Sequence, residues 1–364
     1  MKRNFLLPGI LFASLLSNAQ MDLPPSGGNP RAKITEEVGI TDITISYSRP
    51  DVNGREGKIW GTLVTPGFST TNLNTNKNTN PWRAGANENT IISFEHDVKL
   101  EGVPIKAGSY GLFMAMYPPD SVVIILSRQF NSWGSFYYEP KDEAYRVKVK
   151  PVALDKSVEW LKYEFIEHKE KYCVIAMQWE KLSVPFKVEV DVENIVLARM
   201  REQVSGQRGF NALNMQAAAN YFLNKNINLE EVLAWSQRGA NLKTFSTLNT
   251  LNTNYTKLNR FKEADSVMVE ALGFANANQY LGYGRSLIAA KRADKAMEIF
   301  TAAEKKFGDT YTVNAGYMSG YSAKADFKKA QEYAEKALAQ APSDAAKTAM
   351  NANIAKLKEG KDVN

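Results

Sequence analysis

The residues best suited to chemistry stand in one short stretch, PWRAGANENT at residues 81–90. Trp82, Arg83, Asn87 and Glu88 fall within seven positions of one another there. The planar guanidinium of an arginine can hold a carboxylate or sulfate through two hydrogen bonds, and an indole can stack on a sugar ring or another flat group. Glycine and asparagine, in contrast, are the residues that tight turns require. The residue types therefore fit either a ligand site or a hydrogen-bonded turn.

A second loop, RPDVNGREG at residues 49–57, supplies Asp51 and Arg55 as candidate partners of this motif. In the structural interpretation, Arg83 and Glu88 form ion pairs with each other or with Asp51 and Arg55, and the indole of Trp82 fills the corner between the loops. In the functional interpretation, Arg83 and Arg55 together hold an anionic group of an envelope glycan or peptide. The sequence leaves both interpretations open.

Asp51 and Glu88 are also the residue types of a general acid–base pair, as in glycosidases. Carboxylates flanked by arginines more often form ion pairs, so the sequence favours a binding protein without catalytic residues. A hydrolase that acts on envelope carbohydrate or peptide through Glu88 and Asp51 is the alternative. The two histidines, His96 and His168, lack the spacing of metal ligands, so neither a metal nor another cofactor is expected.

The motif must be held by the first half of the chain, where apolar and polar residues alternate with the period of two that is typical of strands. Ile43 and Ile45 alternate with polar residues, and IISFEHDV at residues 91–98 predicts a single strand with His96 on its inner face. About eight to ten such strands, separated by turns, predict an antiparallel β-sandwich over residues 30–193. The single cysteine, Cys173, alternates with apolar residues and is expected to pack inward.

Several short motifs in this half recur together in a known family. They are RAK at 31–33, YSRP at 47–50, WRAGANENT at 82–90 and AGSYGLF at 107–113. With them the strand half resembles an exported family catalogued as domain of unknown function 2911, in which helical-repeat extensions are familiar. The resemblance implies an exported β domain, and it brings no established activity.

In the second half of the chain the apolar period changes to 3.6, which indicates helices. A small or apolar residue that is suited to a buried helix face recurs there at spacings of 32, 32 and 34 residues: Val232, Ala264, Ala296 and Ala330. Spacing and flanking residues resemble the tetratricopeptide repeat, whose paired helices need small residues in order to pack closely. We expect a helical-repeat domain at residues 199–360, capped by a polar helix at 343–358, with an unrelated helical bundle as the alternative.

The first helix of each pair in such a stack lines a concave groove, and this groove is expected to be polar. The candidate groove residues are Tyr221, Asn249, Thr253, Thr256, Asn278 and Arg285. A surface of this kind suits an extended peptide that is held through its main chain. A rigid spacer without a ligand is the alternative, because a fold alone does not imply a function.

The beginning of the chain has the pattern of a secretory signal peptide at residues 1–19. Two basic residues precede an apolar run, 5–16, that is too short to span a bilayer, and Ala19 precedes Gln20 as a small residue at a cleavage site. A buried N-terminal helix is the alternative. The sequence holds no other apolar run of membrane-spanning length, so the protein is predicted to be periplasmic or secreted.

The net charge of +6 does not indicate a nucleic-acid partner, because the lysines are scattered and form no basic run. Charge, compartment and architecture together predict an exported, non-catalytic binding protein of the bacterial envelope. Its partner is expected to be an envelope peptide, protein or glycan.

Overall fold

The structure is a computed structural model that describes residues 28–69 and 79–364. The chain divides into two compact units, Met1–Ala198 and Arg199–Asn364. Within the described ranges, no helix is both long enough and apolar enough to cross a membrane. The predicted signal peptide at residues 1–19 lies outside the described residues.

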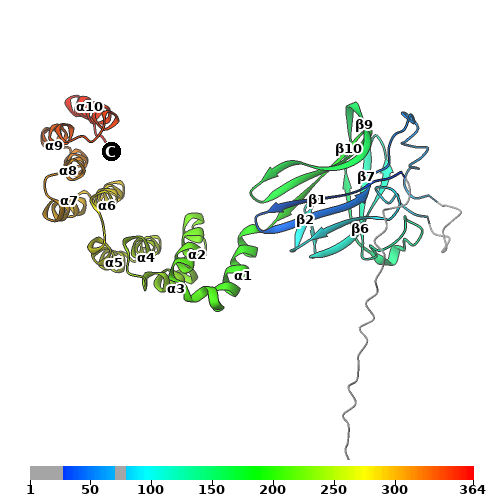
Figure 1. The fold of residues 1–364 in the computed structure, drawn as a ribbon, viewed down its shortest axis with the longest axis horizontal. Helices are drawn as coiled ribbons and strands as arrows, with labels where there is room; N and C mark the ends of the chain where they lie inside the picture. Colours follow the sequence, from blue (N-terminus) through cyan, green and yellow to red (C-terminus); the bar gives the residue numbers. More distant parts are fainter. Residues whose placement is uncertain (1–27, 70–78) are drawn as a thin grey trace, which may run out of the picture. The chain divides into compact units, whose positions relative to one another are not determined.

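The first unit contains a six-stranded antiparallel sheet whose strands are ordered β1-β2-β3-β6-β7-β8 (Figure 1). The strands are β1 (Arg31–Val38), β2 (Thr41–Ser48), β3 (Thr90–Phe94), β6 (Gly108–Tyr117), β7 (Ser121–Ser127) and β8 (Glu143–Val149). A short 3-10 helix, η1 (Pro140–Asp142), precedes β8. Alternate side chains of β2 point into the core, and Ile43 and Ile45 are fully buried, as the period of two predicts.

The second sheet of this unit has four antiparallel strands in the order β5-β4-β10-β9. Its strands are β4 (Val98–Leu100), β5 (Val103–Ile105), β9 (Val152–Lys169) and β10 (Tyr172–Val190). Aromatic contacts join the two sheets: the rings of Tyr47 on β2 and Tyr163 on β9 are 4.8 Å apart between centroids. Cys173 is fully buried on β10, and this burial raises the pKa of its thiol to about 12. The predicted architecture of antiparallel sheets is confirmed.

One strand prediction is wrong, because residues 91–98 do not form a single strand. Strand β3 ends at Phe94, and β4 begins at Val98 in the other sheet. His96 lies in the turn between them, half-buried, with Nδ1 3.0 Å from the hydroxyl of Thr41. The apolar alternation continues across the turn because both strands contribute to the same core, so the pattern alone cannot reveal the change of sheet.

From Val192 onward the chain folds into helices (Figure 1). The helices are α1 (Val192–Ser205), η2 (Gln207–Phe210), α2 (Ala212–Lys225), α3 (Leu229–Ala240), α4 (Phe245–Lys257), α5 (Phe261–Gly273), α6 (Ala277–Ala289), α7 (Ala293–Phe307), α8 (Tyr311–Ala323), α9 (Phe327–Ala339) and α10 (Asp344–Lys358). Helix α1 begins in the first unit and ends in the second.

The recurring small or β-branched positions of the sequence fall on alternate helices of the second unit. Each of them is buried, on α3, α5, α7 and α9 in turn: Val232, Ala264, Ala296 and Ala330. Small side chains at these places let each second helix lie close against its neighbours. Helix α10 ends the stack and buries one face through Met350, Ile354 and Leu357. The predicted helical-repeat fold is confirmed.

Candidate binding sites

The PWRAGANENT motif lies at one rim of the β unit, where it is joined to strand β6. The main chains of Trp82 and Met114 exchange two hydrogen bonds, of 3.0 and 2.8 Å. The indole of Trp82 stacks on Trp179 of β10 with ring centroids 6.0 Å apart, and it meets Trp60 edge-on at 5.8 Å. Trp82 therefore occupies a cluster of three indoles and fills the corner between the sheets.

Behind the indole, the chain makes a tight turn that several hydrogen bonds fix. Ala84 and Asn87 have left-handed backbone angles, with φ of 53° and 56°. The carbonyl of Ala84 accepts hydrogen bonds from the hydroxyls of Thr90, at 3.0 Å, and Tyr163, at 2.9 Å. A Cβ atom on Gly85 would lie only 2.8 Å from the Thr90 hydroxyl, so this position requires glycine. These contacts fit the structural interpretation for this part of the motif.

The polar side chains that follow the turn bind neighbouring loops. The carboxylate of Glu88 accepts a hydrogen bond from the hydroxyl of Ser48 at 3.3 Å, and Asn87 accepts one from Asn29, also at 3.3 Å. The side-chain oxygen of Asn89 accepts a hydrogen bond from the backbone of Ser132 at 3.1 Å. This last contact fixes the loop between β7 and β8 next to the motif.

Asp51 and Arg55 form a separate group. Nη2 of Arg55 lies 3.2 Å from the Asp51 carboxylate, and the same guanidinium binds the carbonyls of Asp51 and Val52. Arg55 thus closes its own loop. Within the described part of the chain, no hydrogen bond or ion pair joins either residue to Arg83 or Glu88, and the expected ion pair between Arg83 and Glu88 is not found. Of the two carboxylates of the hydrolase alternative, that of Asp51 is paired with Arg55 and that of Glu88 accepts a hydrogen bond from Ser48.

Arg83 differs from Glu88, the other charged residue of the motif, because its guanidinium has no hydrogen-bond or ion-pair partner among the described residues. Its Nε atom is buried. Removal of the guanidinium from water lowers the pKa of Arg83 from its ordinary value. The sequence predicts Arg83 as a candidate residue, but its isolation depends on where the neighbouring carboxylates point, and no sequence pattern gives that.

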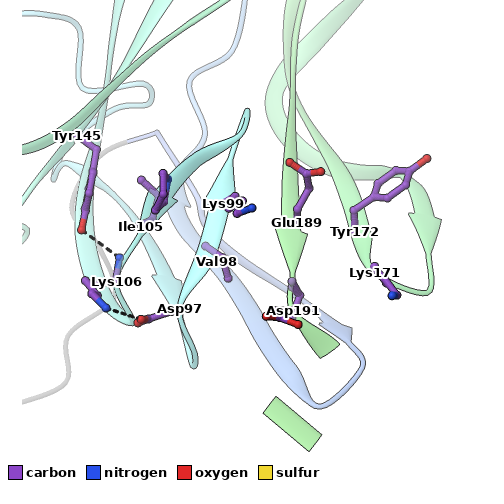
Figure 2. A pocket seen from close by; sticks show the side chains of 12 residues that line it. Asp97, Val98, Lys99, Ile105, Lys106, Tyr145, Lys171, Tyr172, Glu189 and Asp191 are labelled. Carbon is purple, nitrogen blue, oxygen red and sulfur yellow. Dashed lines mark hydrogen bonds and ion pairs between the residues drawn. The ribbon is translucent and has the colours of Figure 1, made fainter. Parts of the chain in front are cut away.

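A cavity of about 480 Å³ lies elsewhere in the β unit, against strands β4, β5 and β10 (Figure 2). Four of the charged side chains that line it, Asp97, Lys106, Lys171 and Glu189, form ion pairs. Lys106 pairs with Asp97 at 2.7 Å, Lys171 with Glu193 at 2.6 Å, and Lys187 with Glu189 at 3.0 Å. Figure 2 also shows the hydroxyl of Tyr145 accepting a hydrogen bond from the Lys106 backbone. Most of the charges that line this cavity therefore already have partners within the protein.

The second unit contains a cleft of about 530 Å³ between α4, the start of α5 and α6. Three predicted groove residues, Asn249, Thr253 and Thr256, line its α4 wall. The other predicted residues lie outside it. The ring of Tyr221 packs against Phe222, and the ammonium of Lys225 lies over it. Asn278 accepts a hydrogen bond from Thr312, and Arg285 is exposed on α6.

The α6 wall of the cleft is formed by residues that the sequence analysis missed. Gln279, Tyr283 and Ser286 line it, within one or two positions of the predicted Asn278 and Arg285. A helix rotates by about 100° per residue, so a small difference in how α6 faces α4 brings these neighbouring side chains into the cleft. The repeat spacing predicts the helix, but it does not predict how α6 is rotated about its axis relative to α4.

The floor of the cleft holds an ion pair and a buried amide. Arg292 pairs with one carboxylate oxygen of Asp265 at 2.7 Å, while the other oxygen, Oδ1, is buried without a partner among the described residues. The amide of Asn252 donates to the carbonyl of Ala264 at 2.8 Å, which explains a polar residue at a position where the repeat has a small one. Burial raises the pKa of Tyr283 above its ordinary value.

The protein therefore joins an antiparallel β domain to a helical-repeat unit. Residues 29–188 match the model of a family described as "Protein of unknown function (DUF2911)". This match confirms the resemblance of the strand half, and the family description assigns no activity.

Among solved structures, the chain is similar to "Crystal structure of APC/C hetero-tetramer Cut9-Hcn1", at 15% identity and a TM-score of 0.32 over 46% of this chain. It covers 33% of that structure's chain. It is also similar to "Crystal structure of YrrB: a TPR protein with an unusual peptide-binding site", at 16% identity and a TM-score of 0.29, over 44% of this chain and 84% of that one. Likeness this weak carries no inference about what this chain binds. No curated protein matches the sequence.

Proposed function

We propose that the protein is a non-catalytic binding protein of the bacterial envelope, exported by residues 1–19, whose helical-repeat unit binds an extended peptide segment between α4 and α6. The cleft between these helices is the observation that carries the proposal. Its volume of about 530 Å³ falls in the range of roughly 300–1,000 Å³ that is typical of ligand pockets. The signal-peptide pattern supports the export.

The side chains of the cleft suit the main chain of a peptide. The carboxamide of Asn249 has no hydrogen-bond partner among the described residues, so both its donor and its acceptor are available. A peptide unit offers one N–H group and one C=O group, which one carboxamide can bind at the same time. The side chains of Phe245, Phe261 and Leu287 also line the cleft. In an extended peptide every second side chain points to the same side, and these apolar residues can contact such side chains.

The experiment starts from a selection of displayed random peptides on the wild-type protein, followed by anisotropy titration of the selected peptides with fluorescent labels. The double variant Asn249→Ala/Thr253→Ala should weaken binding by about tenfold, since it removes two neutral side-chain groups that can hydrogen-bond. Asn351→Ala, on an exposed face of α10, is the matched control and should bind like the wild type.

Two results count against the proposal. The first is a failure to select any peptide that binds the folded wild-type protein. The second is equal affinity of the selected peptides for the wild type and the Asn249→Ala/Thr253→Ala variant, when circular dichroism shows both to be folded.

A further inference from the structure

Arg83 is a cation for which the described part of the protein supplies no counter-charge. The buried Nε atom has no partner, and the terminal nitrogens Nη1 and Nη2 also lack one although solvent reaches them. An arginine stays protonated under all ordinary conditions, so it cannot escape the cost of burial by losing its charge. A buried charge normally persists only with an oppositely charged or hydrogen-bonding partner. The free terminal nitrogens are therefore the place where such a partner would bind.

Among the described residues, the two nearby candidate carboxylates are bound to other partners than Arg83. The carboxylate of Glu88 is bound to Ser48, and that of Asp51 is bound to Arg55. Desolvation is the cause of the lowered pKa of Arg83, and no neighbouring negative charge opposes it. The uncompensated charge is consequently available to an anion from outside the protein.

A second feature is an exposed tryptophan, Trp133, next in sequence to a glycine that lies near the guanidinium. A Cβ atom on Gly134 would lie 3.7 Å from Nη1 of Arg83, so the loop between β7 and β8 approaches this nitrogen. Trp133 precedes that glycine and is 50% exposed, and its backbone forms an isolated bridge with Glu88. Asn89 holds the loop in place through Ser132. The loop next to the free nitrogens thus carries an exposed indole that is not buried in the core.

We propose that Arg83 and Trp133 form a binding site for an acidic saccharide, in which the guanidinium holds a carboxylate or sulfate group and the indole packs against the sugar ring. The planar fork of an arginine matches the two oxygens of such groups. An indole supplies a large apolar face for a ring at low conformational cost. This role differs from the one that the sequence suggests, because Trp82 is committed to the core cluster and Arg55 to Asp51.

The test is calorimetric titration of the full chain at constant ionic strength with four probes. They are D-glucuronate, glucose 6-sulfate, neutral glucose and inorganic sulfate. We expect the two acidic sugars to bind more tightly than inorganic sulfate, because only they reach the indole, and we expect no binding of glucose.

Variants separate the two parts of the site. Arg83→Met should weaken binding of the acidic sugars by roughly 10- to 100-fold, the loss expected for hydrogen bonds to a charged group. Trp133→Ala should weaken the acidic sugars by about threefold to tenfold and leave inorganic sulfate unchanged. Arg201→Met, at an exposed position of α1 outside the site, is the matched control, and its affinities should equal those of the wild type.

The proposal is overturned if the wild type binds neither acidic sugar, or if Arg83→Met binds them as tightly as the wild type. It is also overturned if Trp133→Ala changes none of the affinities. Trp133 is exposed, so its variant tests the site even where Arg83→Met does not fold.

Discussion

Two glycines on helix α6 stand two positions apart and have opposite surroundings. A Cβ atom on Gly284 would lie 2.2 Å from the ring of Phe300, whereas a Cβ atom on Gly282 would meet nothing within 4 Å. Gly316 on α8 approaches the same ring, at 2.6 Å. Phe300 is therefore enclosed by glycine backbone on both α6 and α8, and the absence of a side chain at Gly284 and Gly316 allows these helices to pack.

This contrast predicts opposite effects of the same substitution. Gly284→Ala should lower the stability of the helical unit, because overpacking typically costs about 1–3 kcal/mol. Gly282→Ala, the matched control on the open face, should raise it by roughly 0.5–1 kcal/mol through helix propensity alone. Urea unfolding followed by circular dichroism at a helix-sensitive wavelength measures both. Equal effects of the two substitutions would mean that Gly284 does not pack against Phe300 as described.

At the scale of elements, the sequence predicts periodic features well. Alternation correctly placed Ile43 and Ile45 in the core of β2, and the repeat spacing correctly placed Ala264 and Ala296 on buried helix faces. It could not show that the chain changes sheet between Phe94 and Val98, since both strands contribute apolar residues to one core. A change of sheet is a tertiary event, and it leaves the local period intact.

The candidate sites were predicted in part, for the same physical reason. Residue type and position identified Arg83 and Asn249 as candidates. The guanidinium of Arg83 lacks a partner because the carboxylates of Glu88 and Asp51 bind other groups. Tyr283 lines the cleft because of the way α6 is rotated against α4. No sequence motif marks Trp133 as a candidate, because an exposed aromatic residue becomes informative only when its neighbours in space are known.

At the scale of the whole molecule, the proposal assigns two binding surfaces to two compact units. The β unit presents the rim of Arg83 and Trp133, and the helical unit presents the cleft between α4 and α6. Both surfaces suit partners that are found in an envelope, which links the proposed activities to the proposed export.

Export makes a prediction about the mature protein. The chain recovered from the periplasm or the medium should begin at Gln20, because a signal peptidase cleaves after a small residue such as Ala19. Mass spectrometry of the N-terminal peptide measures this directly. Ala19→Arg should leave an uncleaved precursor. A chain that keeps residues 1–19 and stays in the cytoplasm would contradict the proposed compartment.

The central claim, that a peptide lies between α4 and α6, is tested most directly by amide hydrogen exchange of the wild-type protein with and without a selected peptide. Bound peptide should slow exchange in α4 (Phe245–Lys257) and α6 (Ala277–Ala289), since it stabilises the two walls of the cleft. Unchanged exchange in both helices, with protection confined to α8–α10 or to the β unit, would contradict the account.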